Sequence, residues 1–123
     1  MDVTRTPQNS TGNTGIADSA RYARQLQLPE IGPEGQRLLA QTSVAVVGAG
    51  GLGAPLLYYL TAAGIGRIAI IDCGVVSPSN LQRQILYCES DLAHPKAIQA
   101  QKRLTALNST LQIEAITERL NET

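Results

Sequence analysis

The sequence predicts an α/β protein built around a parallel sheet, and three observations support this class. A short β-branched run at Val44–Val47 leads directly into a glycine-rich turn. Two further apolar runs follow, at 68–71 and 111–116, and the segments between them repeat their apolar residues at helical spacing. This alternation is typical of parallel strands joined by right-handed helical crossovers. The predicted fold is therefore Rossmann-like, with one βαβαβ nucleotide-binding half preceded by N-terminal helices.

Composition narrows the class of protein. The 123 residues are 43% hydrophobic but include no Trp, no Phe and only four Tyr, so the core must be aliphatic. A formal net charge of zero argues against nucleic acid or a membrane surface as a partner. No apolar run approaches the roughly 20 residues that span a bilayer, and the N-terminus lacks the apolar segment of a secretory signal. We expect a cytoplasmic protein, whose two cysteines are too few for a disulfide scaffold.

The chain divides into a tail and one domain. Residues 1–18 are rich in Thr, Asn, Ser and Gly and lack apolar periodicity, which predicts a disordered tail. Residues 19–123 form the predicted domain. Within it, the stretch from Ser19 to about Gln41 predicts one or two short helices, the second opened by Pro33.

The regular part of the domain begins near residue 43. The run Val44–Val47 has no polar alternation, which predicts a strand that is buried on both faces. After the glycine turn, we expect a helix that stops at Gly64. Its predicted buried face consists of Leu52, Leu56, Tyr59, Leu60 and Ala63. Tyr59 is thus expected in the core, and Tyr58 is expected to be available for a subunit contact.

The second half of the domain repeats this pattern. A strand over Ile68–Ile71 ends at Asp72, a helix starts near Pro95, and a third strand covers Leu111–Ile116. The apolar stripe of the helix consists of Ala97, Ala100, Leu104 and Leu107. Because doubly wound sheets usually continue beyond their first strand, we expect the chain to be the front part of a larger protein. The first strand is then an apolar edge and a predicted site of association.

A glycine motif lies between the first strand and its helix. Gly48, Gly50 and Gly53 match G-x-G-x-x-G, in which the first glycine allows a tight turn and the second lets a phosphate approach the helix N-terminus. Asp72 ends the next strand, where a carboxylate can accept hydrogen bonds from ribose hydroxyls. A packing turn and a capping carboxylate are the alternatives, and a nicotinamide or flavin dehydrogenase fits both features equally well.

Two positively charged residues favour a triphosphate over a dinucleotide as the ligand. Arg83, within Ser79–Gln84, and Lys96 add positive charge that a single pyrophosphate rarely requires. A planar guanidinium and a compact ammonium together can neutralise a pentacovalent phosphorus and a leaving pyrophosphate. The alternative is that both residues are solvated cations at helix ends.

In combination, these motifs resemble the ThiF/MoeB/HesA family, the ubiquitin-activating-enzyme-like adenylyltransferases. The resemblance covers about residues 19–120. It rests on Arg21–Gln25, Gly48–Gly53, Asp72, Ser79–Gln84 and Pro95–Lys96. The Leu81–Gln82 pair resembles the activators of sulfur carriers for thiamin and molybdopterin synthesis more than the tRNA-modifying branch.

The resemblance implies a reaction and a set of site residues. The C-terminal glycine carboxylate of a small ubiquitin-like sulfur-carrier protein attacks the α-phosphate of ATP, which gives an acyl adenylate and pyrophosphate. Positioning and charge neutralisation suffice for this step, without a protein nucleophile. The implied ATP contacts are Gly48, Gly50, Gly51 and Gly53 along the phosphates, Asp72 at the ribose, Asn80, Arg83 and Lys96 at phosphate groups, and Gln84 beside them. Arg24 would reach the ATP of the other subunit in a homodimer.

The sequence also departs from the family pattern. Members often carry a second acidic residue two positions after the ribose aspartate, where this chain has Gly74. The family's magnesium-binding aspartate and its zinc cysteines are expected beyond residue 123, so Mg²⁺ and Zn²⁺ have no ligand assigned in this chain. We therefore expect these residues alone to adenylate nothing efficiently. Two alternatives stay open: a non-catalytic truncated paralogue that binds nucleotide or carrier, and an NAD-dependent oxidoreductase half-domain.

Three other reactive residues carry weaker signals. Cys73 and Cys88 have no neighbouring base and are expected to be small packed thiols rather than nucleophiles. His94 precedes a proline at a predicted helix start, so we expect a capping or loop role. The three residues are too scattered along the chain to predict a zinc site.

Overall fold

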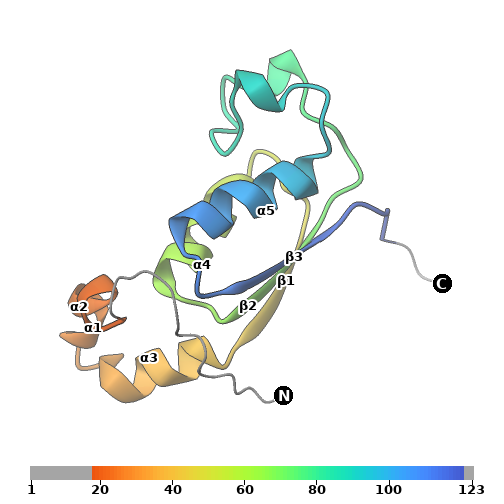
Figure 1. Ribbon diagram of the computed structural model, residues 1–123. Helices are drawn as coiled ribbons and strands as arrows, with labels where there is room; N and C mark the ends of the chain where they lie inside the picture. The colour runs from red at the N-terminus through yellow and green to blue at the C-terminus, as the bar shows by residue number, and fades with distance from the viewer. Residues whose placement is uncertain (1–17, 121–123) are drawn as a thin grey trace.

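The computed structural model describes residues 18–120, which form a small sheet with helices on one face and a lobe of short helices at one end (Figure 1). The helices are α1 (Asp18–Arg21), α2 (Ala23–Leu26), α3 (Gly32–Ala40), α4 (Gly53–Ala63) and α5 (Lys96–Leu107), with short 3-10 turns η3 (Pro78–Asn80) and η4 (Glu89–Asp91). The strands are β1 (Ser43–Val47), β2 (Arg67–Ile71) and β3 (Gln112–Ile116). The predicted tail lies outside the described residues except for Asp18, which begins α1.

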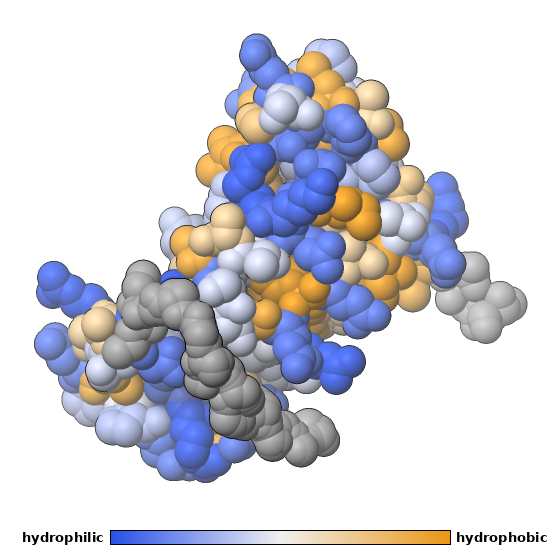
Figure 2. Space-filling view, in the orientation of Figure 1, coloured by the Kyte–Doolittle hydropathy of each residue, from blue (hydrophilic) through white to orange (hydrophobic). Residues whose placement is uncertain are grey.

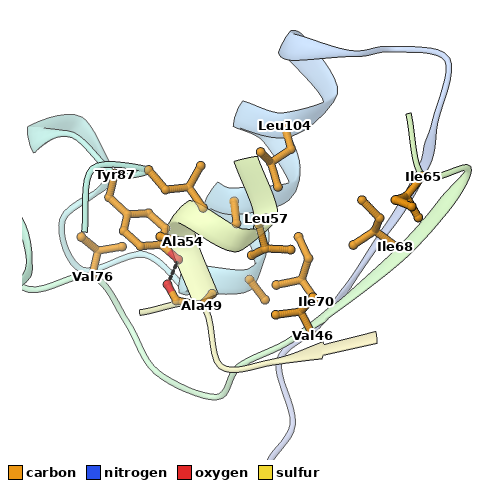
Figure 3. Close-up of a cluster of buried hydrophobic side chains, with 13 residues drawn as sticks. Val46, Ala49, Ala54, Leu57, Ile65, Ile68, Ile70, Val76, Tyr87 and Leu104 are labelled. Atoms are coloured by element: carbon orange, nitrogen blue, oxygen red, sulfur yellow. Dashed lines mark hydrogen bonds between the residues drawn. The ribbon is translucent and has the colours of Figure 1, made fainter. Parts of the chain in front are cut away.

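The sheet has the predicted parallel topology, with strand order β1-β2-β3. Val46 pairs with Ile70, and Ile70 pairs with Ala115, so the central strand is β2. Both crossover helices, α4 and α5, lie on the same face of the sheet (Figure 1). Right-handed crossovers between strands taken in sequence order place successive helices on one face. The core therefore forms between this face and the two helices, as Figure 3 shows for Val46, Ile70, Leu57 and Leu104.

The expectation that the first strand is buried on both faces is wrong. Val46 points to the helices and is 6% exposed, whereas Val47 points to the opposite face and is 62% exposed. Within the described part of the chain, no helix covers that second face. Among the strands of residues 18–120, β1 pairs with β2 alone, so it is an edge strand as expected.

The predicted buried face of α4 is wrong for three of its five residues, while Leu60 packs against the core and Ala63 is partly buried. Leu52, Leu56 and Tyr59 are exposed, whereas the buried residues of α4 are Ala54, Leu57 and Thr61. The roles of the two tyrosines are exchanged, since Tyr58 is half-buried against the core and Tyr59 is 77% exposed. Nearly every residue of α4 is apolar, so periodicity does not select a face, and packing against β1 and α5 selects it instead.

Three short helices replace the one or two expected before β1, and polar contacts attach them to the ends of the longer helices. Gln25 and Gln36 both donate to the carbonyl oxygen of Ala63, at 3.1 and 3.0 Å. The Asn108 side chain donates to the Tyr22 hydroxyl at 2.8 Å. This lobe has a mostly hydrophilic surface, while apolar patches gather over the sheet, α4 and α5 (Figure 2).

Candidate nucleotide-binding site

The glycine loop between β1 and α4 adopts a conformation that depends on its glycines. Gly48 has φ of +97°, in the left-handed region. A β-carbon on Gly53 would lie 1.9 Å from the carbonyl oxygen of Gly48, so the loop closes too tightly for any other residue. The backbone N–H groups of Gly50, Gly51 and Leu52 donate to no residue that the structure describes. Free N–H groups at the start of an 11-residue helix make a favourable anion site.

Asp72 follows β2 directly and lies beside this loop. Its Oδ2 accepts a hydrogen bond from the Ala49 N–H at 2.8 Å, and its Oδ1 accepts one from the Gly74 N–H at 2.7 Å. Each carboxylate oxygen can accept a further hydrogen bond. The position is therefore suited to ribose hydroxyls, which are donors.

Arg83 and Gln84 lie against the glycine loop from the other side. The backbone N–H groups of both donate to the carbonyl oxygen of Asn80, and the Arg83 guanidinium donates to the Ser79 carbonyl. Arg83 Nε is 3.6 Å from where a β-carbon on Gly51 would stand, and Gln84 Nε2 is 3.4 Å from one on Gly50. Gln84 is 3% exposed, and its Oε1 is buried without a described partner. The side-chain donors occupy the space that the two glycines leave open.

The side-chain oxygen of Asn80 is occupied by hydrogen bonds within the local turn. Its Oδ1 accepts hydrogen bonds from the Ser77 N–H and hydroxyl, at 2.9 and 3.0 Å, in a capping box over η3. Its NH₂ group is the half that can still donate to a ligand.

Lys96 reaches the site because the chain doubles back on itself. Its backbone N–H donates to the Gly74 carbonyl at 3.0 Å, next to an antiparallel bridge between Val75 and Pro95. The Lys96 Cδ is 4.0 Å from where a β-carbon on Gly74 would lie. That β-carbon would also stand 3.1 Å from Asp72 Oδ1, so Gly74 leaves both side chains uncrowded.

Arg24 is not brought to this site. Its neighbour Gln25 contacts Ala63, the last residue of α4, whereas the glycine loop is at the first. An 11-residue helix spans roughly 16 Å, and Arg24 lies beyond its far end. Within one copy of the chain, the arginine and the loop are therefore at opposite ends of α4.

An open pocket of about 270 Å³ adjoins Asp72 at the carboxyl ends of the strands. Its lining includes the apolar side chains of Val47, Ile71 and Leu120, together with Gly48. The carboxyl edge of a parallel sheet is where such folds bind ligands. Charged Glu118 and Arg119 complete the lining, so the pocket has room for a small ligand group with both apolar and polar parts beside Asp72.

Sequence reasoning missed Tyr87, which no motif singles out. Its hydroxyl donates to the Ala49 carbonyl at 2.5 Å, and the side chain is 5% exposed (Figure 3). Burial, followed by the nearby charge of Asp72, raises the pKa of the Tyr87 hydroxyl, so it remains a donor at physiological pH. Only the folded chain brings Tyr87 and Ala49 together, across 38 residues of sequence.

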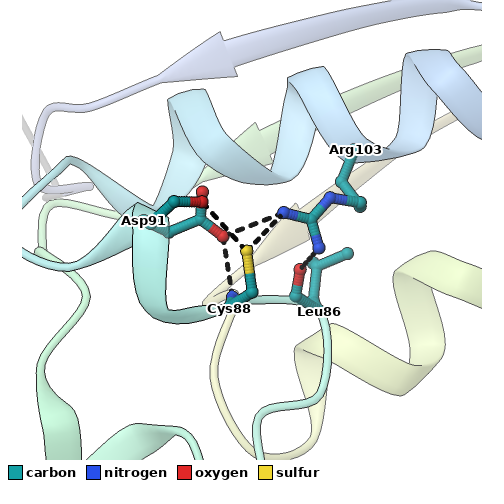
Figure 4. Close-up of polar contacts among 5 residues, drawn as sticks. Leu86, Cys88, Asp91 and Arg103 are labelled. Carbon is teal, nitrogen blue, oxygen red and sulfur yellow. Dashed lines mark hydrogen bonds and ion pairs between the residues drawn. The ribbon is translucent and has the colours of Figure 1, made fainter.

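The cysteines are exposed, contrary to the expected packed thiols, because both lie on surface loops. Figure 4 shows Cys88 in a cluster with Asp91 and Arg103. Arg103 donates to the Leu86 carbonyl at 3.0 Å and pairs with the buried Asp91 carboxylate at 3.0 Å, which ties the loop to α5. A hydrogen bond with Ser90, followed by one from Arg103, lowers the pKa of the Cys88 thiol. His94 lies in a loop, as expected, and its carbonyl accepts from the Val76 N–H.

The structure of residues 18–120 gathers no group of three His, Cys, Asp or Glu side chains that could hold a metal ion. None of the helices described there is long and apolar enough to cross a membrane.

Fold and loop together define a Rossmann-like nucleotide-binding domain, and comparison with solved structures agrees. A crystal structure of E. coli MccB with ATP superimposes with a TM-score of 0.74 at 30% identity, over 93% of this chain and 33% of that one. A structure of TcdA superimposes with a TM-score of 0.77 at 27% identity, over 86% of this chain and 42% of that one.

The chain belongs to the ThiF family, whose model matches residues 22–123. It is 55% identical over 100 residues to a sulfur carrier protein adenylyltransferase of Thermus thermophilus, covering 81% of this chain and 37% of that protein. It is 52% identical over 95 residues to the adenylyltransferase and sulfurtransferase MOCS3 of Danio rerio, covering 77% of this chain and 21% of that protein. The chain thus spans less than two fifths of the length of either relative.

Proposed function

We propose that residues 19–123 are the N-terminal part of an ATP-binding adenylation domain. The enzyme would activate the C-terminal glycine carboxylate of a ubiquitin-like sulfur-carrier protein, for thiamin or molybdopterin cofactor biosynthesis. One observation carries the proposal: the free N–H groups of the glycine loop lie opposite two side-chain donors, Arg83 and Gln84. Donors on both sides of one loop suit a chain of phosphates.

The proposed roles follow from the donors and acceptors of each residue. The backbone at Gly50 and Gly51 holds phosphate oxygens, and Gly48 and Gly53 keep the loop in shape. Asp72 accepts from the ribose hydroxyls. The remaining contacts to phosphate groups come from Asn80 through its free NH₂ group, Gln84 through its Nε2, and Arg83 and Lys96 through their charges.

The proposed reaction requires no protein nucleophile. A carboxylate oxygen of the carrier attacks the α-phosphorus, the bond to the bridging oxygen breaks, and that electron pair leaves with pyrophosphate. Arg83 and Lys96 neutralise charge on the phosphorus and on the leaving group. Mg²⁺, when bound, would neutralise further phosphate charge, and its ligands, like those of Zn²⁺, are proposed to lie beyond residue 123.

The proposal includes a homodimer in which Arg24 serves the other subunit. The distance between Arg24 and its own glycine loop, along the whole of α4, supports this assignment. The names of the relatives, which include sulfur carrier and molybdopterin-synthase adenylyltransferases, support the class of partner. Two free cysteines fit a reducing compartment, and we propose the cytoplasm.

Calorimetric titration tests the nucleotide preference. The chain should bind MgATP more tightly than NAD⁺, and Arg83→Ala should weaken MgATP binding about tenfold, since a hydrogen bond to a charged group contributes about 1.5–3 kcal/mol. Arg37→Ala is the matched control, because Arg37 is exposed and pairs with Glu34 on α3. A preference for NAD⁺ would contradict the proposal and favour the oxidoreductase alternative.

Pyrophosphate exchange tests the reaction itself. A longer protein that contains this domain should show carrier-dependent exchange between ATP and pyrophosphate. Lys96→Ala should strongly reduce the exchange rate and leave the free energy of unfolding of that protein nearly unchanged. The 123-residue chain alone should bind nucleotide with little exchange. Carrier binding without any exchange in the longer protein would indicate the non-catalytic alternative.

A further inference from the structure

The backbone of Ala49 is held on both sides. Its N–H donates to Asp72 Oδ2 at 2.8 Å, and its carbonyl oxygen accepts from the Tyr87 hydroxyl at 2.5 Å. Ala49 is fully buried, and Figure 3 shows the Tyr87 ring directed at it from the loop that precedes α5. Residues on either side of Ala49 are glycines, whose backbone rotates most freely.

The Ala49 carbonyl and the Gly50 N–H belong to the same planar peptide unit. This unit is trans, as are all those described in the structure, so the C=O and N–H bonds point in opposite directions. When the carbonyl faces the buried Tyr87, the Gly50 N–H must face away from the core. That N–H donates to no described residue. A peptide flanked by glycine can rotate between the two orientations, as type I and type II turns do, unless a contact fixes it.

Tyr87 is itself fixed strongly enough to select one orientation. Its ring is buried with Val76 and Leu86 in the core, and its backbone N–H donates to the Gln84 carbonyl at 3.1 Å. Arg103 holds the neighbouring Leu86 carbonyl from α5. The hydroxyl therefore approaches Ala49 from a rigid part of the molecule, which is the condition for preorganising a donor.

We propose that Tyr87 is a positioning residue: its hydroxyl holds the peptide between Ala49 and Gly50 so that the Gly50 N–H points at a nucleotide phosphate. The inference rests on the proposed function, because the phosphate must lie on the glycine loop. It assigns Tyr87 to phosphate affinity and leaves ribose contacts to Asp72. Removal of the hydroxyl is expected to weaken the binding of ADP and to leave the binding of adenosine unchanged.

Calorimetric titration of the chain with ADP and adenosine tests the inference. Tyr87→Phe should reduce the ratio of ADP affinity to adenosine affinity about tenfold, the loss expected for one hydrogen bond to a charged group. Tyr22→Phe is the matched control, because Tyr22 is also 5% exposed and its hydroxyl accepts a buried hydrogen bond far from the loop. This variant should lose a similar amount of stability and keep the wild-type ratio.

Two outcomes separate failure of the inference from failure of the proposed function. An unchanged ratio in Tyr87→Phe, with a normal preference of the wild-type chain for ADP, would overturn the inference alone. No preference for ADP in the wild-type chain would overturn both.

A second measurement does not depend on the variant. In ¹⁵N-labelled wild-type chain, ADP should shift the Gly50 amide proton signal, and adenosine should leave it in place. A Gly50 signal that ADP leaves unmoved would overturn the inference even where Tyr87→Phe does not fold.

Discussion

Single contacts decide the shape of the glycine loop. Gly53 has no room for a β-carbon beside the Gly48 carbonyl, Asp72 binds the Ala49 N–H, and Tyr87 binds the Ala49 carbonyl. Each of these interactions fixes the backbone of the loop. At the scale of residues, the loop is thus a set of oriented N–H groups, and orientation is what makes such groups effective toward an anion.

Cys88 provides a pH-dependent prediction at this scale. Its pKa is lowered first by Ser90 and then by Arg103, so its reactive thiolate forms at a lower pH than that of a free thiol, whose pKa is about 8.5. The rate of Cys88 alkylation by iodoacetamide should increase with pH, and the midpoint of this increase should lie below the pKa of a free thiol. Mass spectrometry measures the rate at each pH. Ser90→Ala should move the midpoint of the profile upward, and Ser109→Ala, on an exposed turn, should not. Identical profiles for all three chains would contradict the prediction.

Packing decides which face an element buries when its composition does not. On α4, the buried residues are Ala54, Leu57 and Thr61, whereas Leu56 and Tyr59 face outward. On α5, the predicted stripe is largely confirmed: Ala97, Ala100 and Leu104 are fully buried, and Leu107 is 41% exposed at the helix end. The difference arises because α5 has polar residues between its apolar ones, and α4 has almost none.

A pair of substitutions on α4 tests this assignment of faces. Leu57→Ala should lower the free energy of unfolding by about 2–5 kcal/mol, because it opens a cavity in the core. Tyr59→Ser should change it by less than about 0.5 kcal/mol, since Tyr59 is 77% exposed. Urea denaturation measures both values. The reverse order would restore the face expected from the sequence.

At the scale of the whole fold, residues 18–120 present a helix-covered face of the sheet, an uncovered face and an unpaired edge. The helices α4 and α5 cover one side of the sheet, and β1 has no neighbour on its outer edge within the described structure. Val47 and Leu52 expose apolar surface next to that edge. Unpaired strand edges with apolar neighbours favour association with other chains.

Sedimentation equilibrium tests this property of the whole chain. The chain should associate as its concentration rises, and Val47→Lys should weaken the association several-fold, because charged residues block edge pairing. Thr105→Lys adds the same charge on the exposed side of α5 and serves as the control. Equal weakening by both variants would assign the effect to net charge instead of the edge.

The sequence by itself determined the order of the elements, the parallel sheet, and most of the candidate site. These properties are encoded locally: apolar runs define strands, Gly64 ends α4, and the spacing of Gly48, Gly50 and Gly53 defines the loop. Asp72 and Arg83 were predictable for the same reason, since each follows a recognisable element or motif along the chain.

Only the tertiary structure decided the exposed face of α4, the single buried face of β1, the exposure of both cysteines, and the contact of Tyr87 with Ala49. Each depends on what packs against a residue from a distant part of the chain. Burial and hydrogen bonding are properties of such neighbours, and local sequence pattern does not specify them when an element is apolar on all sides or a contact spans many residues.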